Sequence, residues 1–250
     1  MFKPRAGGYF ISTMLVGIPR LFHVFSTRKF GDMCQASNRS GFVQQFGLSE
    51  RDLVWPQQVH GDAINVVNSD DCGKIITNTD GLIWQKQGFE QVILALHVAD
   101  CVPIIMVDPV KQIIAAVHAG WRGTLLDIAG KVIEKMIRLG ADPKNIQLSL
   151  GPAIGSCCYA VDRRRGEKFR QIFGQNHAIL MRRAGKWFLD LAEANRQQLL
   201  ARGILAKHID RSDLCTACRN NDFFSYRRDT KESFGEIIGL IGFMHKPSKL

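Results

Sequence analysis

Short apolar runs recur along this chain and restrict its possible folds more than any other feature of the sequence. Each run is long enough for a β-strand and too short for a typical helix. Several runs are joined by short turns, such as the one at Asp108 and Pro109. The clearest runs lie at residues 63–68, 91–98, 102–107, 113–117, 146–150 and 237–243. The sequence therefore predicts a fold rich in strands.

Helical periodicity is confined to fewer segments. It is clearest over residues 123–139, where apolar residues recur at steps of three and four before Gly140. A second helix is predicted from Asp190, whose carboxylate could cap it, to about Arg202, and a third over residues 163–173. Because strands outnumber helices, we predict an α+β fold, a mixed sheet with helices packed outside. No linker or repeat divides the sequence, so residues 1–250 are expected to form a single domain.

Charge and cysteine usage restrict the partners and the compartment. The chain has 33 Lys and Arg against 23 Asp and Glu, a net charge of +10 that attracts anions in general. These basic residues are scattered, so we expect no nucleic-acid partner. No segment reaches the roughly 20 apolar residues of a membrane helix, so we expect no membrane partner, and residues 9–18 are interpreted as a strand. The seven cysteines do not resemble a secreted disulfide framework, and this favours a cytoplasmic location.

Two neighbouring predicted strands place chemically reactive residues at their ends. Cys101 precedes one strand and His118 ends the next, so a hairpin of this length would bring the two side chains to the same sheet edge. A thiolate and an imidazole together suit zinc or copper. His60, in a polar turn, is the third candidate ligand. Arg122 and the start of the following helix form a candidate phosphate pocket.

The residues alone leave other functions open, because the gaps between these candidate ligands match no compact zinc signature. In one alternative, Cys101 is a nucleophile and His118 is its base, as in a cysteine hydrolase or amidase. In another, the chain is a basic binding protein for an acidic partner and has no catalytic activity.

Several sequence motifs together resemble those of one family. This is the YfiH-type family, long labelled multicopper polyphenol oxidase or laccase-domain proteins. The motifs follow the family order from about His23 to Phe243. They are STR at 26–28, PQQVHG, TDGLI at 79–83, ADCVPI, HAGWRGT, GPAIGSCCYAV and FFSYRRD.

This resemblance implies a fold, a metal and an activity. The fold is a single domain with α/β/β/α layers, and the ligands of a zinc ion are His60, Cys101 and His118, with copper as the alternative metal. The activity is that of a purine nucleoside phosphorylase on adenosine, inosine, guanosine and methylthioadenosine, with adenosine deaminase activity at the same site. The older copper polyphenol oxidase label is physically weak, because a laccase needs further histidine clusters and this chain has seven histidines and no His-x-His pair.

Roles can be assigned to residues on this basis. Asp100 is the nearest candidate proton shuttle beside Cys101 and His118. Nucleoside and phosphate are the expected small-molecule partners, and the expected substrate-binding residues are Arg28, Gln58 and Arg122. The FFSYRRD segment could supply aromatic side chains and a cation that contact a ligand.

The sequence departs from the family pattern at some positions. Ala160 stands where the family usually has Glu, and Glu236 stands where it usually has Arg, so one anion contact is missing or reversed. His97 is an addition that could line the pocket from the same strand face as Cys101. Cys215 and Cys218 form a Cys-x-x-Cys pair with no partner pair at matching spacing, so a redox-sensitive thiol pair is favoured over a four-cysteine zinc site.

Overall fold

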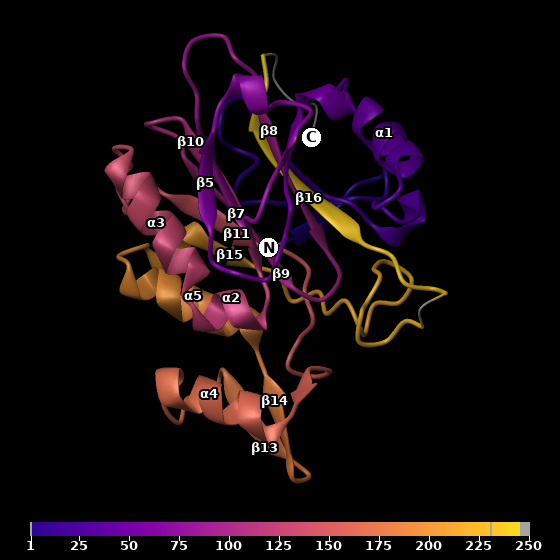
Figure 1. Cartoon of the computed structure of the whole chain (residues 1–250), viewed down its shortest axis with the longest axis vertical. Helices are drawn as coiled ribbons and strands as arrows, with labels where there is room; N and C mark the ends of the chain where they lie inside the picture. The colour runs from indigo at the N-terminus through magenta and orange to yellow at the C-terminus, as the bar shows by residue number, and fades with distance from the viewer. Residues whose placement is uncertain (1, 231, 246–250) are drawn as a thin grey trace.

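Two β-sheets packed face to face form the centre of the molecule (Figure 1). The computed structural model describes residues 2–230 and 232–245. The first sheet contains, in order, β1 (Phe2–Pro4), β2 (Phe10–Ser12), β3 (Leu21–Phe25), β16 (Ile237–Phe243), β8 (Ile93–Val98), β4 (Leu53–Pro56) and β6 (Ile75–Ile76). The second contains β15 (Ile209–Arg211), β11 (Gln147–Leu150), β9 (Val102–Asp108), β10 (Ile113–Ala119), β7 (Gly81–Gln85) and β5 (Ile64–Val67). Both sheets mix parallel and antiparallel pairs.

The central strands are buried on both faces, which explains why they are continuous apolar runs. In β9, Ile105 and Val107 belong to the core between the two sheets, whereas Ile104 and Met106 belong to the core beneath the helices of the second sheet. This alternation follows from the two-residue period of a strand. Each central strand therefore contributes to two hydrophobic cores at once.

Helices cover the outer faces of both sheets. Phe42 and Val43 of α1 (Ala36–Gln44) pack against the first sheet. On the second sheet, α3 (Ile128–Arg138) and α5 (Leu191–Ala201) contribute to the outer core. Figure 1 shows α1 and α3 on opposite sides of the strands. The predicted mixed α/β fold with α/β/β/α layers is confirmed.

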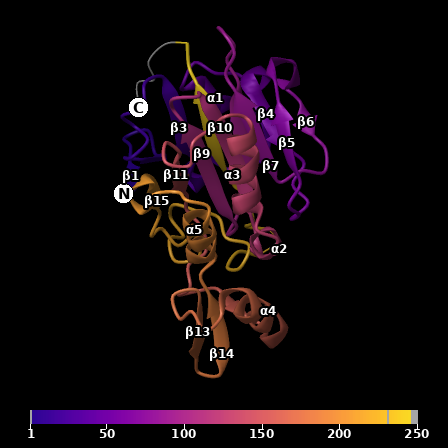
Figure 2. The ribbon, with the colours of Figure 1, turned by 90° about the vertical axis from the view of Figure 1, so that its left-hand side faces the viewer.

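A small third sheet projects from one end of these layers (Figure 2). Its strands are β12 (Ala160–Val161), β14 (Lys186–Leu189) and β13 (Leu180–Arg183). The helix α4 (Arg163–Phe173) packs closely on it, since a Cβ at Gly166 would lie 2.8 Å from Cγ of Trp187. This unit matters for the site because Tyr159 immediately precedes it and Arg165 lies in its helix.

Two of the three predicted helices are confirmed, and the third is wrong. The helices α4 and α5 lie where they were predicted, and Asp190 caps α5 by accepting the Glu193 N–H at 2.8 Å. The single helix predicted over 123–139 is wrong, because the segment forms α2 (Trp121–Leu125) and α3 with a break at Asp127. Asp127 has a left-handed backbone (φ 58°), and its carboxylate accepts the Gly130 N–H at 3.2 Å to start α3.

The remaining helical segments are short. Of the strand predicted over residues 9–18, only β2 is a strand in the structure. None of the described helices combines the length and the apolar composition needed to cross a bilayer. The 3₁₀ turns are η1 (Arg28–Phe30), η2 (Glu50–Asp52), η3 (Ser69–Asp71) and η4 (Ala206–His208).

The burial of His23 is expected to make the stability of this fold dependent on pH. His23 is fully buried in β3, and its Nε2 lies 3.1 Å from the Ser12 nitrogen and 3.0 Å from the Ser12 carbonyl oxygen. Burial lowers the pKa of His23 from 6.5 to about 4. The unfolded chain therefore binds the proton more readily, and stability should fall as the pH decreases from 6.5 toward 4, by about 3 kcal/mol for this group.

This expectation is checked by urea unfolding across that pH range. The variant His23→Gln should lose much of the decline, and His177→Gln, which changes an exposed histidine, should keep it. An equal decline in all three proteins would show that His23 is not responsible.

Candidate functional site

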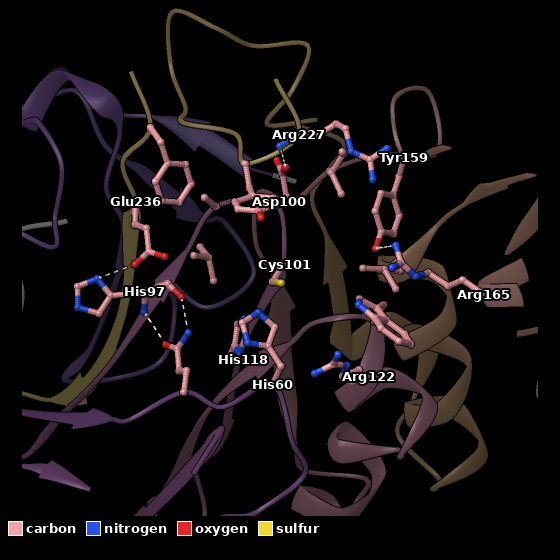
Figure 3. A pocket seen from close by; sticks show the side chains of 18 residues that line it. His60, His97, Asp100, Cys101, His118, Arg122, Tyr159, Arg165, Arg227 and Glu236 are labelled. Atoms are coloured by element: carbon pink, nitrogen blue, oxygen red, sulfur yellow. Dashed lines mark hydrogen bonds and ion pairs between the residues drawn. The ribbon is translucent and has the colours of Figure 1, made fainter. Parts of the chain in front are cut away.

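The candidate site lies where a loop, a turn and a strand end from the two sheets come together (Figure 3). His60 lies on the loop between β4 and β5, Cys101 on the turn between β8 and β9, and His118 near the end of β10. His118 pairs with Pro103 in the β9–β10 hairpin, which places Cys101 at the same end. The candidate ligand atoms of the three residues lie within 4.8 Å of one another. The predicted convergence of Cys101 and His118 is confirmed.

Asp80, directly before β7, organises this site. Its fully buried carboxylate accepts a hydrogen bond from His118 Nδ1 at 2.8 Å, so the other ring nitrogen of His118 is left for the site. It also accepts the N–H groups of Val59, His60 and Gly61 at 3.2, 3.0 and 2.7 Å, which fixes the loop that carries His60. Burial alone would raise the pKa of Asp80, but these donors lower it below its usual value.

Asp80 is not among the site residues predicted from the sequence. It lies within the TDGLI motif, so the signal was present, but the motif alone does not show which residues the carboxylate contacts.

The electrostatics of the site favour a thiolate. Burial by itself raises the pKa of Cys101, but His118 and His60 lower it to about 7. In the same way, burial lowers the pKa of His118, while Cys101 and Asp80 raise it above its usual value. A thiolate is the form of cysteine that binds metals.

The donor set and the space around it fit one metal ion. Tetrahedral zinc with bonds of about 2.0–2.3 Å needs ligand atoms roughly 3.3–3.8 Å apart, which small side-chain shifts would reach here. A Cβ at Gly120 would lie 3.0 Å from Cys101 Sγ and 3.2 Å from His60 Cδ2, so only glycine leaves this space open. Three protein ligands leave one coordination position for another group. In residues 2–230 and 232–245, no group of three or more potential ligands contains more than two histidines.

The three residues lie in the wall of a cavity of about 560 Å³. This volume is within the range typical of small-molecule sites. Arg122, Arg165 and Arg227 provide positive charge, and Asp100 and Glu236 provide carboxylates. The aromatic lining residues are Trp121, Tyr159, Tyr226 and Phe234. The cavity can therefore combine stacking surfaces with anion recognition.

The arginines approach the pocket from separate parts of the chain. The Arg165 guanidinium lies 4.4 Å from the ring centre of Trp121, and its Nη1 lies 3.5 Å from the Tyr159 hydroxyl. Arg227 Nη1 donates to the Ala160 carbonyl at 2.7 Å. Arg165 was not among the predicted site residues, because the basic residues are scattered along the sequence and nothing local distinguishes this one. Arg227 belongs to the segment expected to supply a cation, and that segment does line the cavity.

The predicted substrate-binding residues occupy different positions. Arg122 lines the cavity. Gln58 also lines it, but its amide is paired with the His97 backbone, donating at 2.8 Å and accepting at 2.9 Å. Arg28 is not among the lining residues, because its Nη1 binds Asn220 at 2.6 and 2.8 Å and its guanidinium covers Phe224. The helix end expected to help bind phosphate belongs to α2, which spans only Trp121–Leu125.

Asp100 lies in the pocket wall in a strained conformation, with φ of 83°. Its carboxylate accepts hydrogen bonds from Thr216 Oγ1 at 2.6 Å, Ser225 Oγ at 3.0 Å and the Arg227 N–H at 2.7 Å. Both oxygens are therefore engaged. This geometry suits a residue that positions the Cys101 turn, and the role of proton shuttle stays a prediction.

Two of the departures from the family pattern also lie at this site. Glu236 and His97 line the cavity opposite Arg122 and Arg165, as Figure 3 shows. Glu236 Oε2 lies 3.1 Å from Cys34 Sγ and 3.5 Å from His97 Nδ1. The His97 ring stacks on Trp55 with centroids 4.4 Å apart. This side of the cavity therefore carries an acid rather than an additional cation.

The fold and the site together define a mixed α/β protein with a His-Cys-His donor set in the wall of a pocket. The chain belongs to the family described as multi-copper polyphenol oxidoreductase laccase, whose family model matches residues 28–244. The resemblance to YfiH-type proteins found in the sequence is confirmed.

Individual relatives agree with this assignment. Purine nucleoside phosphorylase YlmD from Geobacillus stearothermophilus is 40% identical over 216 residues, which cover 82% of this chain and 77% of that protein. Adenosine deaminase RL5, from an unknown prokaryotic organism, is 36% identical over 199 residues, covering 76% of this chain and 75% of that protein.

Solved structures are similar over nearly the whole chain. The structure of the Bacillus licheniformis hypothetical protein YfiH matches with a TM-score of 0.88 at 30% identity, covering 97% of this chain and 99% of that one. The structure of YlmD from Geobacillus stearothermophilus matches with a TM-score of 0.85 at 31% identity, covering 98% of this chain and 99% of that one.

Proposed function

We propose that this chain is a zinc-dependent purine nucleoside phosphorylase that acts on adenosine, inosine, guanosine and methylthioadenosine, and that it deaminates adenosine at the same site. The observation that carries the proposal is the His60, Cys101 and His118 donor set in the wall of a cavity lined by arginines and aromatic rings. The names of two relatives, a purine nucleoside phosphorylase and an adenosine deaminase, support it.

His60, Cys101 and His118 would hold the zinc, with Asp80 orienting His118. The ion, when bound, would supply Lewis acidity at the open side of the cavity. The carboxylate of Asp80 keeps the proton of His118 on Nδ1, so that the other ring nitrogen faces the ligand position.

The other pocket residues would bind and orient the substrates. Arg122, Arg165 and Arg227 could hold phosphate for attack at the ribose C1′, because guanidinium groups make charge-assisted hydrogen bonds to phosphate oxygens. Tyr226 and Phe234 offer ring faces on which a purine can stack. Glu236 lies on the other side of the cavity, away from Arg122 and Arg165, where its carboxylate could accept an N–H from the base.

The decisive experiment is to incubate metal-replete protein with adenosine, with and without phosphate, and to identify the products by chromatography. With phosphate, adenine and ribose 1-phosphate are expected, and without phosphate, inosine and ammonia. The chelated protein should form neither product, and added zinc should restore both. If the metal-replete protein leaves adenosine unchanged both with and without phosphate, the proposal is rejected.

Replacing Arg122 should affect phosphate more than nucleoside. The change Arg122→Ala removes up to two charge-assisted hydrogen bonds to phosphate and should raise the phosphate KM by roughly tenfold, with a much smaller change for adenosine. Steady-state kinetics with each substrate varied in turn measure both constants. Arg164→Ala is the matched control, because Arg164 is exposed and lies outside the cavity lining. An unchanged phosphate KM in Arg122→Ala would contradict the assigned role.

One observation favours a second candidate function. Cys101, His118 and Asp80 also form a Cys–His–Asp arrangement, with Asp80 holding His118 and His118 beside the thiol. Such an arrangement can activate a cysteine nucleophile in a hydrolase or amidase. Exhaustive removal of metal separates the two functions, because a cysteine hydrolase would keep its activity and the proposed enzyme would lose it.

A further inference from the structure

A second cluster of metal-binding side chains lies outside the site described above. The Sγ atoms of Cys157, Cys158, Cys215 and Cys218 all lie within 4.8 Å of one another. Cys218 Sγ is 3.5 Å from Cys157 Sγ and 3.3 Å from Cys158 Sγ. The first two cysteines precede β12, and the other two follow β15. The fold therefore brings together two cysteine pairs that the sequence spacing did not connect.

Backbone contacts hold the two pairs in this arrangement. Ala153 and Cys215 form an isolated parallel bridge, and the Thr216 N–H donates to the Ala153 carbonyl at 3.1 Å. The Gly155 N–H donates to Cys215 Sγ at 3.2 Å, a contact that stabilises a thiolate. A Cβ at Gly155 would lie 3.2 Å from Cys157 Sγ, so glycine at this position leaves room for the sulfur atoms.

We propose that these four cysteines bind one zinc ion, separate from the His60, Cys101 and His118 site. Four thiolates form a typical structural zinc site, and Cys215 and Cys218 have the Cys-x-x-Cys spacing found in such sites. Tetrahedral zinc with Zn–S bonds of about 2.3 Å places sulfur atoms roughly 3.8 Å apart, close to the separations present here. Four protein ligands fill the coordination sphere, so this ion takes no substrate.

A disulfide accounts for the cluster less well. Cys218 is nearly equidistant from Cys157 and Cys158, so a bond to either would leave the other next to it as a thiol. Pairing all four sulfur atoms as disulfides would need a second bond, between Cys157 and Cys215, whose thiols are in contact. One zinc ion engages all four sulfur atoms.

The second zinc would stabilise the wall of the candidate active site. Cys158 directly precedes Tyr159, which lines the cavity. Thr216, between the other two cysteines, donates to Asp100, the residue before Cys101. The Ile154 N–H also donates to the Asp100 carbonyl at 3.0 Å. The ion therefore joins two segments that both contact the turn carrying Cys101, although it lies outside the first donor set.

Metal content tests the proposal directly and does not depend on any enzymatic activity. Protein purified under reducing conditions, without chelators, should contain two zinc ions per chain by elemental analysis. Cys218→Ser and His118→Ala should each contain one ion, and the double variant none. Cys72→Ser should keep two, because Cys72 belongs to neither cluster. One zinc in the wild type that persists in Cys218→Ser but disappears in His118→Ala would overturn the second site and leave the first intact.

Cobalt substitution identifies the ligands where metal content alone does not. His118→Ala protein loaded with Co²⁺ should show intense sulfur-to-cobalt charge-transfer absorption and the visible bands of a tetrahedral ion. Both signals should be absent from the double variant that also carries Cys218→Ser. Thiol titration of denatured, unreduced wild-type protein tests whether the cluster forms a disulfide instead. If metal-free protein has two or four thiols fewer than the seven cysteines of the chain, the cluster forms one or two disulfides and the zinc proposal fails.

Discussion

Replacing Cys101 with alanine is expected to remove the metal from the His60 and His118 site and to reduce adenosine turnover by about a thousandfold. The two remaining imidazoles are neutral ligands, and the lost thiolate carries the negative charge that balances the ion. A catalytic metal supplies several kcal/mol of transition-state stabilisation, and each 1.36 kcal/mol changes the rate tenfold. Elemental analysis and the adenosine assay on the same preparation measure both effects.

The controls separate loss of the metal from loss of a nucleophile. Cys72→Ala removes a thiol that belongs to no cluster and should leave metal content and turnover unchanged. Wild-type protein stripped of metal should be as inactive as Cys101→Ala and should recover with zinc, whereas a cysteine hydrolase would remain active without metal. Full turnover in Cys101→Ala would exclude both the zinc enzyme and the cysteine nucleophile.

The variant Asp80→Asn is expected to weaken zinc binding by roughly ten- to a hundredfold, the usual effect of losing a carboxylate that orients a metal-binding histidine. The amide keeps the shape of the side chain but replaces one acceptor oxygen with an NH₂ group. That group would face N–H donors of His118 and the loop at residues 59–61. Buried donors without an acceptor also destabilise the fold, by about 1–3 kcal/mol each.

Competition with a chromophoric chelator measures the zinc affinity, and thermal unfolding of the metal-free protein measures the effect on the fold alone. Asp62→Asn is the matched control, because Asp62 lies on the same loop and forms a partly exposed ion pair with Lys131 that should contribute little. Wild-type zinc affinity in Asp80→Asn would show that His118 is oriented without this carboxylate.

The fold could be predicted from the sequence to the extent that it depends on local patterns. Strands such as β9 are continuous apolar runs because both of their faces are buried. Asp190 acts as the expected cap because its carboxylate accepts an N–H three residues later. The break at Asp127 was missed because the apolar periodicity continues through it, although the backbone there leaves the helical conformation.

The site could be predicted only where short connections bring residues together. Cys101 and His118 meet because one hairpin joins them. Asp80 reaches His118 through the pairing of β7 with β10, a contact that motif letters do not reveal. Arg165 depends on how α4 packs near Trp121, and the four-cysteine cluster depends on the bridge between Ala153 and Cys215. Such contacts follow from tertiary packing, for which a sequence pattern gives no direct signal.

The turn that carries Cys101 is where the chain passes from the first sheet, in β8, to the second, in β9. His60 follows a strand of the first sheet, and His118 lies in a strand of the second. During folding, an intermediate that has formed only one sheet would lack part of the ligand set, so tight metal capture must follow the docking of the two sheets. The rate at which the refolding chain acquires tightly bound metal would then measure how fast the two sheets dock.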